Sequence, residues 1–157
     1  MLDWPAVVEE MGDRLYSVAL RITGNQQDAE DCVQQTFLSA CRGLSHFRQD
    51  ARLSTWLYKI VVNQSLAIGR RKTFSRLTYE QALLVRAPEG WEAATVSQEA
   101  VETALAQLPM DYRTAVVLRD VEGLSTAEAA TVLGCNERAL KSRLHRGRVL
   151  LRARLMG

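Results

Sequence analysis

Residues 122–157 read EGLSTAEAATVLGCNERALKSRLHRGRVLLRARLMG, and they contain two helical patterns separated by a turn that begins at Gly134. Ser125 is predicted to begin the first helix. Its hydroxyl can accept a hydrogen bond from the backbone amide of Glu128, while the Glu128 carboxylate accepts one from the amide of Ser125. Gly134 is predicted to end that helix, because glycine adopts the left-handed conformation at low cost. Asn136 can cap the next helix. The sequence therefore predicts a helix-turn-helix.

The second of these helices separates an apolar side from a basic side. At about 100° per residue, its apolar side consists of Leu140, Leu144, Gly147, Leu151 and Leu155. The opposite side carries Arg138, Lys141, Ser142, His145, Arg146, Val149 and Arg152. Residues 137–157 hold seven arginines and lysines against the single acid Glu137, whereas an ordinary exposed helix mixes both signs. A solvated charged face is the plainer interpretation. The excess of positive charge beside a capped helix and turn favours contact with DNA.

Charge is also segregated along the rest of the chain, although the net charge of its 157 residues is only +2. Acids dominate residues 1–31, and bases dominate residues 32–72, where Asp50 is the single acid. The first part of the chain therefore has a basic surface of its own. The hydrophobic content of 47% suffices for a core in one domain or in two small ones.

The sequence contains no cluster of residues typical of catalysis or metal binding. Cys32 and Cys41 point to opposite sides of one predicted helix and Cys135 is distant, which argues against a disulfide or a zinc site. His46 and His145 lack a second ligand at metal spacing, and no nucleophile or carboxylate pair forms a catalytic arrangement. We expect no enzyme activity, no metal and no cofactor. No apolar run approaches the roughly twenty residues of a membrane span, and no export signal is present. We therefore expect a cytoplasmic protein without membrane insertion.

Helical spacing recurs in the first 72 residues. A first helix is predicted to begin near Asp3, and a second is predicted from a cap at Asn25 to Arg42. A third helix is predicted to begin with Ser54 as its cap. On this third helix Lys59 and Asn63 are four residues apart, so they share one face.

The pattern weakens after residue 72 and resumes near residue 98. Residues 73–97 contain Pro88 and Gly90 without a sustained apolar stripe, so a linker is predicted, with a short helix near 79–85. Further helices are predicted from Glu99 and from Pro109. Strand-like alternation is absent. We therefore predict an all-α protein with two small helical domains, residues 1–72 and 98–157, joined by a flexible linker over 73–97.

Two longer stretches resemble a known family. Residues 28–72, DAEDCVQQTFLSACRGLSHFRQDARLSTWLYKIVVNQSLAIGRRK, resemble region 2 of the extracytoplasmic-function group of bacterial sigma factors. Residues 104–155, ALAQLPMDYRTAVVLRDVEGLSTAEAATVLGCNERALKSRLHRGRVLLRARL, resemble region 4 of the same proteins. The two stretches occur in the family's order and leave mainly the linker uncovered. Residues 1–72 and 98–157 are thereby interpreted as sigma region 2 and sigma region 4.

The resemblance implies contacts with core RNA polymerase. In the family, the second helix of region 2 binds the clamp helices of the β′ subunit, and region 4 binds the β flap. The matching residues here are Asp31, Val33, Gln34, Phe37 and Leu38. For Val33, Phe37 and Leu38, a place in the hydrophobic core is an equally good interpretation.

The resemblance also implies two contacts with promoter DNA. Region 2 holds melted single strand at the −10 element, and the matching residues are Phe47, Arg48, Lys59 and Asn63. Stacking on an aromatic ring and hydrogen bonds from an amide suit unpaired bases. Region 4 reads the −35 element as duplex, and the basic helix supplies Arg138, Lys141, Ser142, Arg143, His145, Arg146 and Arg148. Arg143 and Arg148 lie off the centre of its face, where a phosphate contact or a surface ion pair suits them better.

The function implied is that of an alternative sigma factor, which gives core polymerase its promoter choice and helps to open the duplex. Members of this group are commonly held inactive by an anti-sigma factor, so one is expected as a partner. A stand-alone helix-turn-helix repressor is an alternative, but it leaves Phe47, Lys59 and Asn63 without a role. A sigma-like adaptor that sequesters a regulator is a second alternative, but it leaves the basic helix without a role.

Overall fold

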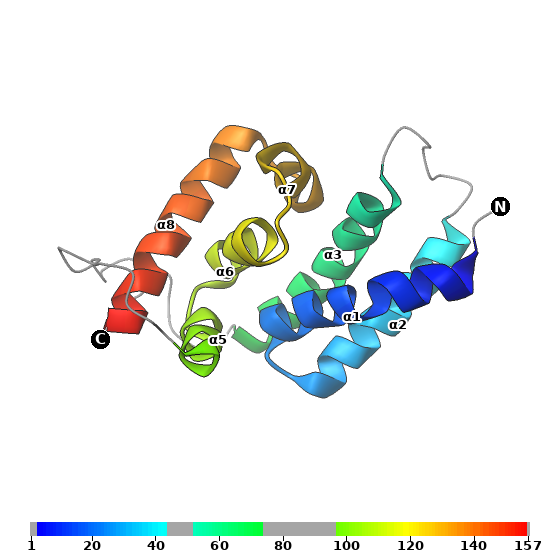
Figure 1. The fold of residues 1–157 in the computed structure, drawn as a ribbon, viewed down its shortest axis with the longest axis horizontal. Coiled ribbons are helices and arrows are strands. Elements are labelled where there is room, and N and C mark those ends of the chain that lie inside the picture. The colour runs from blue at the N-terminus through cyan, green and yellow to red at the C-terminus, as the bar shows by residue number, and fades with distance from the viewer. Residues whose placement is uncertain (1–2, 44–51, 74–96, 157) are drawn as a thin grey trace.

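The computed structural model describes residues 3–43, 52–73 and 97–156, and every element within them is helical (Figure 1). The first half contains α1 (Trp4–Thr23), α2 (Gln26–Arg42) and α3 (Leu53–Thr73). The second half contains α5 (Gln98–Ala106), α6 (Met110–Val116), the π-helical turn η2 (Val117–Val121), α7 (Thr126–Leu133) and α8 (Glu137–Met156). The predicted all-α architecture is confirmed. The helix predicted near 79–85 lies outside the described residues.

Local signals set the ends of α1 and α2. Gly24 ends α1 in the left-handed conformation, with φ at 72°, and its amide donates to the carbonyl of Leu20 at 2.7 Å. The side chain of Asn25 then accepts a hydrogen bond from the amide of Asp28 at 2.9 Å, as predicted for a cap. The helices α1, α2 and α3 pack on one another around fully buried residues that include Leu15, Val18, Ile22, Leu57 and Val61.

The prediction that Ser54 caps the third helix is wrong. The helix α3 begins at Leu53, and the amide of Trp56 donates to the carbonyl of Arg52 at 3.2 Å. Ser54 therefore lies within the first turn. A serine in the first turn and a serine at the cap precede the same apolar pattern, so spacing alone does not separate them by one or two residues.

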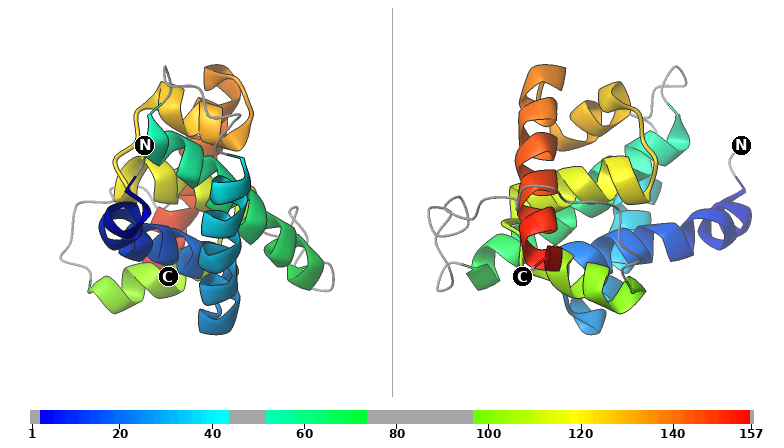
Figure 2. Two further views of the ribbon diagram at one scale, coloured as in Figure 1. Left: turned by 90° about the vertical axis from the view of Figure 1, so that its right-hand side faces the viewer. Right: turned by 60° about the vertical axis from the view of Figure 1, so that its left-hand side comes forward.

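The second half surrounds α6 and η2 with the other helices. The Ser97 hydroxyl caps α5 by accepting from the amide of Ala100 at 3.2 Å, and Pro109 immediately precedes α6. The helix α8 packs on α5, α6 and α7. It lies on the side of the molecule away from α1 and α2 (Figures 1 and 2). One face of α8 is therefore left open.

The two halves also pack directly on each other, which the sequence did not predict. The most extensive contact joins α3 to α7, and α1 contacts α5, α6 and η2 (Figure 2). The buried apolar residues of both halves form one continuous cluster. The domains are thus in contact through their side chains as well as being connected along the chain.

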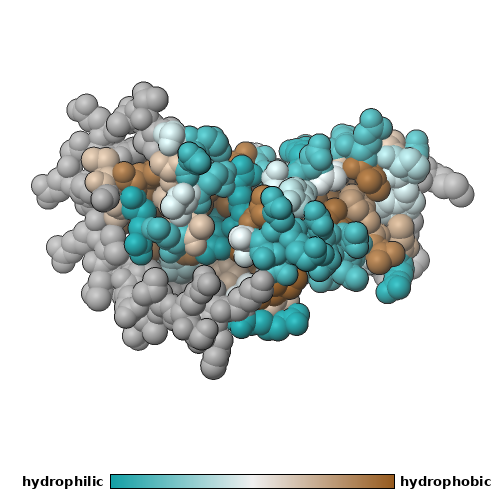
Figure 3. Space-filling model, turned by 90° about the horizontal axis from the view of Figure 1, so that it is seen from below, coloured by the Kyte–Doolittle hydropathy of each residue, from teal (hydrophilic) through white to brown (hydrophobic). Residues whose placement is uncertain are grey.

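The surface of the described residues shows no concentration of large apolar side chains on one element. The exposed ones are Val8, Leu38, Val121 and Met156, which belong to α1, α2, η2 and α8. Seen from below, hydrophilic residues occupy most of the described surface, with smaller hydrophobic patches between them (Figure 3). Among the described helices, none is long and apolar enough to cross a membrane.

Candidate nucleic-acid interface

The helix-turn-helix predicted from residues 122–157 is present with its expected hydrogen bonds. The Ser125 hydroxyl accepts from the amide of Glu128 at 3.1 Å, and a Glu128 carboxylate oxygen accepts from the amide of Ser125 at 3.1 Å. Gly134 follows α7 with φ at 68°. The Asn136 side chain caps α8 by accepting from the amide of Ala139 at 2.7 Å. Both helix starts and the turn between them therefore follow from local chemistry.

The capping box makes a pH-dependent contribution to stability. The hydrogen bond from the Ser125 amide, with a smaller contribution from Arg52, lowers the pKa of Glu128 below its ordinary value of 4.5. A carboxyl group whose pKa is lower in the folded state stabilises that state fully above its unfolded pKa, and the contribution is lost as the pH falls through the folded pKa. The stabilisation by Glu128 is therefore present at neutral pH and declines in acid.

We expect Glu128→Ala to lower the free energy of unfolding by about 1 kcal/mol at pH 7, the usual scale for a lost cap. The deficit should shrink as the pH falls from 5 to 3, and urea unfolding followed by circular dichroism would measure it. Glu128→Gln is the matched control, because glutamine keeps the acceptor without the titrating carboxyl. An Ala deficit that is the same at pH 7 and pH 3 would contradict the proposed carboxylate bond.

The helix α8 exposes the predicted basic face. Its buried stripe consists of Leu140, Leu144, Gly147, Leu150 and Ala153. Five residues assigned to DNA contact are exposed on the opposite side, namely Arg138, Lys141, Ser142, His145 and Arg146. The stripe agrees with the prediction as far as Gly147. In the last turns Leu150 and Ala153 are buried, and the predicted Leu151 and Leu155 are only half-buried.

A close approach of two helices holds this face in place. A Cβ atom added to Gly147 would lie 2.9 Å from the carbonyl oxygen of Tyr112 and 2.7 Å from a methyl group of Val116. Both residues belong to α6, so α8 passes α6 at a point where only a glycine fits. The orientation of the basic face is therefore set by packing against α6.

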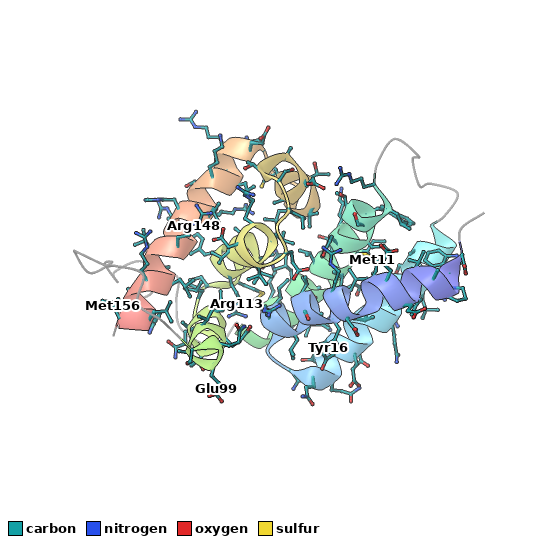
Figure 4. All side chains as sticks on the ribbon, viewed as in Figure 1. Met11, Tyr16, Glu99, Arg113, Arg148 and Met156 are labelled. Atoms are coloured by element: carbon teal, nitrogen blue, oxygen red, sulfur yellow. The ribbon has the colours of Figure 1, made fainter. Side chains whose placement is uncertain are left out.

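Arg143 and Arg148 differ from the centre of the face. Arg143 is half-buried. Arg148 is exposed and pairs with Asp120 of η2 through two hydrogen bonds, at 2.6 and 3.0 Å (Figure 4). The Asp120 hydrogen bond raises the pKa of the Arg148 guanidinium. Arg148 thus makes the surface ion pair that the sequence left as one of two alternatives, and it ties α8 to η2.

The predicted −10 residues fall only partly within the described residues. Lys59 and Asn63 are both exposed on α3, one turn apart, so they share a face as predicted. Phe47 and Arg48 lie outside the described residues. Trp56, on the same helix, is half-buried and packs against the hydrophobic core.

The predicted polymerase-binding residues of α2 divide into two groups. Asp31, Gln34 and Leu38 are exposed, and Leu38 retains 48% of its surface. Val33 and Phe37 are half-buried and pack against the core. The outer group forms an exposed surface of mixed polar and apolar character. The inner group supports it from beneath.

We also searched the described residues for metal-binding clusters and for pockets. Among them, no three His, Cys, Asp or Glu side chains lie close enough to hold a metal ion. A groove of about 340 Å³ between α1 and α5 is lined mainly by apolar atoms and contains the ion pair of Arg21 with Glu102. The notable surfaces of the described chain are therefore the faces of α8, α3 and α2.

Comparison with known proteins identifies both halves. The family described as Sigma-70 region 2 matches residues 7–74, and the family described as Sigma-70, region 4 matches residues 98–151. The chain is 39% identical to the ECF RNA polymerase sigma factor SigM of Mycobacterium tuberculosis, over 92% of this chain and 72% of that protein. It is 35% identical to the ECF RNA polymerase sigma factor SigE of Mycolicibacterium smegmatis, over 97% of this chain and 61% of that protein.

A solved structure shares the whole fold. The sigma factor RpoE of Bartonella quintana, in complex with the anti-sigma factor NepR, superposes with a TM-score of 0.76 at 24% identity. The match covers 98% of this chain and 97% of that one. At this identity the likeness concerns the fold. With the sequence relatives and the two matched regions, it leads to one assignment: the chain belongs to the extracytoplasmic-function (ECF) group of the sigma-70 family of RNA polymerase sigma factors.

Proposed function

We propose that the chain is an alternative sigma factor that binds core RNA polymerase, selects promoters through their −35 and −10 elements, and promotes melting of the duplex. The single observation that carries this proposal is the exposed basic face of α8 on a complete helix-turn-helix, in one chain with the exposed Lys59 and Asn63 of α3. A protein that only reads duplex DNA needs the basic face of α8 and not the exposed residues of α3. Two surfaces of different chemistry suit a protein that holds duplex and melted DNA together.

The proposed −35 contact uses the centre of the α8 face. Lys141 and Arg146 are exposed and can donate to the acceptors O6 and N7 of guanine in the major groove. Ser142 and His145 lie between them and can bond either type of base edge. Arg138 and Arg143 lie nearer the edges, where phosphate contacts are expected. Arg148, which is already paired with Asp120, contributes to orientation and to the local positive potential.

The proposed −10 contact uses α3. The amide of Asn63 can donate and accept at an unpaired base edge, and Lys59 one turn away can contact the phosphate backbone. Phe47 and Arg48 are proposed for the same strand from the sequence resemblance. Capture of bases outside the stack would stabilise the open duplex, so melting requires binding energy and no bond-breaking reaction. The family consists of DNA-binding regulators, and we propose no catalytic activity for this chain.

The proposed polymerase contact uses the outer residues of α2. Leu38 offers exposed apolar surface, and Asp31 and Gln34 offer polar groups beside it. We assign this face to the β′ clamp helices and region 4 to the β flap. An anti-sigma factor that covers these surfaces is the proposed inhibitor, in line with the complex in which the related fold was solved. The proposed place of action is the cytoplasm, where core polymerase and promoter DNA are found.

Selection of DNA from a random library, with and without purified core polymerase, tests this function against its rivals. We expect the chain alone to enrich little, and the chain with core polymerase to enrich sequences with two separated blocks. Two weak contacts on one tethered molecule combine through effective concentration, and polymerase holds them in register. Strong enrichment by the chain alone would favour a stand-alone repressor. No enrichment in either condition would favour an adaptor that binds another protein.

A further inference from the structure

An acid of η2 lies against the edge of the basic face of α8. The Nε of Arg148 donates to one carboxylate oxygen of Asp120 at 3.0 Å, and its Nη2 donates to the other at 2.6 Å (Figure 4). The Arg148 side chain retains 45% of its surface, and that of Asp120 retains 37%. The contact is therefore a two-bond pair that stays accessible to a ligand approaching this side of α8.

The backbone that carries Asp120 is anchored on both sides. Val117 and Leu118, which precede it in η2, are fully buried. Beyond it, the amide of Leu124 donates to the carbonyl of Leu118 at 3.0 Å. The Arg119 guanidinium donates to the carbonyl of Leu124 at 2.6 Å, which closes the connection between η2 and α7. The fold itself therefore holds the Asp120 carboxylate beside α8.

Arg148 lies where an unpaired arginine could reach DNA. It follows Lys141 by seven residues, so the two side chains leave α8 about 20° apart and about 10 Å apart along the helix axis. Lys141 is exposed on the proposed −35 face. Recognition helices place their first turns on base edges, so a basic residue farther along the helix meets the phosphate backbone. Arg148 is therefore placed for a phosphate contact.

Asp120 competes with phosphate for this arginine. A carboxylate and a phosphate offer an equivalent pair of oxygens to a guanidinium. Asp120 occupies the Nε and Nη2 donors of Arg148, and its negative charge repels a phosphate beside it. An exposed pair adds little stability, and the packing at Gly147 already sets the position of α8 on α6. The main effect of Asp120 is therefore on the charge that α8 presents to DNA.

The size of this effect follows from the salt dependence of DNA binding. Each neutralised phosphate makes the slope of log affinity against log salt steeper by about 0.9. One contact more or less therefore changes duplex affinity by roughly tenfold at 50 mM salt and by roughly threefold at 200 mM. Chromosomal DNA offers about a million or more competing sites of unrelated sequence. A single contact thus alters how much of the free protein remains unbound.

We propose that Asp120 withholds Arg148 from phosphate and so limits the binding of the free chain to unrelated duplex DNA, which keeps the chain available to core polymerase. The proposal rests on the proposed function, because availability to polymerase matters for a sigma factor. It gives a role in DNA binding to an acid outside the helix-turn-helix.

Asp120→Asn tests the proposal, with Glu9→Gln as its matched control. Asparagine keeps the shape of aspartate and loses its charge. Glu9 is exposed on α1, away from α8, and its substitution changes the net charge by the same amount (Figure 1). Fluorescence anisotropy with a labelled duplex of unrelated sequence gives the affinity between 50 and 200 mM salt. Asp120→Asn should bind roughly tenfold tighter at 50 mM, with a slope steeper by about 0.9, and Glu9→Gln should stay within about twofold of the parent.

The double variant Asp120→Asn with Arg148→Gln separates the phosphate contact from the change in net charge. It removes both members of the pair and has the same net charge as the parent. Its affinity and salt slope should therefore return to those of the parent. Arg148→Gln alone keeps the test decisive if the Asp120 variants do not fold, because a parent that does not use Arg148 on phosphate loses no phosphate contact with it. Its salt slope should equal that of the parent.

Binding to core polymerase in the presence of competitor DNA is the second readout. For each variant, the affinity for purified core polymerase is measured without DNA and with an excess of unrelated duplex. The competitor should weaken the apparent affinity of Asp120→Asn several-fold more than that of the parent or of Glu9→Gln. The ratio of the two measurements reports trapping on DNA, separately from any direct effect on polymerase binding.

Three results would overturn the proposal. An unchanged salt slope for Asp120→Asn would show that Asp120 does not withhold a phosphate contact. A shallower slope for the double variant or for Arg148→Gln would show that Arg148 contacts phosphate while paired. A steeper slope without a larger competitor effect would show that Asp120 does not preserve the supply of free protein. If the parent does not bind polymerase at all, the proposed function fails, while the salt slopes still decide whether Asp120 withholds Arg148.

Discussion

Replacing Lys141 and Arg146 together by alanine is expected to reduce the affinity of the polymerase-bound protein for its promoter by roughly 30-fold or more. Both side chains are exposed at the centre of the α8 face. A good contact from such a residue to guanine contributes about 1–3 kcal/mol of discrimination, so loss of two of them removes most of the −35 recognition. Competition between a selected promoter and the same DNA with a scrambled −35 block would measure the effect. The alanine variant should lose the preference between the two DNAs.

The double variant Lys141→Arg with Arg146→Lys distinguishes the effect of side-chain donor geometry from the effect of positive charge on DNA binding. It keeps the charge and so should keep most of the affinity for unrelated duplex DNA, which depends on phosphate contacts. It should still weaken promoter discrimination, because arginine and lysine present different donor geometries to a base. If both the alanine and the exchanged variants discriminate like the parent, this face of α8 does not read the promoter.

Replacing Gly147 by valine is expected to destabilise the second half by about 3 kcal/mol, at the upper end for an overpacked site. The added side chain would meet the backbone carbonyl of Tyr112 at 2.9 Å, and backbone cannot rotate away. The helix α8 must then move off α6, which also misplaces the basic face. In a chain of this size the loss corresponds to a fall of about 6–12 °C in the unfolding midpoint.

Thermal unfolding followed by circular dichroism would measure this change, with Gly12→Val as the control. A Cβ atom at Gly12 meets no atom within 4 Å, so the control should unfold within a few degrees of the parent. Equal midpoints for the two variants would contradict the close packing of α8 on α6. A lower midpoint with unchanged promoter affinity would contradict the dependence of the basic face on that packing.

The sequence predicted the features that depend on neighbouring residues. The capping box of Ser125 and Glu128, the left-handed Gly134 and the Asn136 cap are all local, and each is present. Helical spacing also placed Lys59 and Asn63 on one exposed face. Helical spacing was less accurate where packing against other helices determines which residues are buried. In the last turns of α8, Leu150 and Ala153 are buried in place of the predicted Leu151 and Leu155.

The contact between the halves could not be predicted in the same way. Arg113 of α6 donates to the carbonyl of Ile22, although the two are 91 residues apart and no periodicity links them. No signal near Arg113 was available either, since Asp111 and Thr114 beside it are also polar and nothing marks Arg113 as the arginine that is buried. The identity of its acceptors depends on how the domains meet. On α2, helical spacing left core packing and polymerase contact equally open for Val33, Phe37 and Leu38. In the structure only Leu38 is exposed.

Run-off transcription with purified core polymerase tests the central claim most directly. Templates carrying promoters selected with the polymerase-bound protein should give transcripts of defined length only when the protein is added. Asn63→Ala should greatly reduce those transcripts from duplex templates, and templates with a pre-melted −10 region should recover part of the loss. No protein-dependent transcript from any selected template, with core polymerase shown to be active by another sigma factor, would contradict the account.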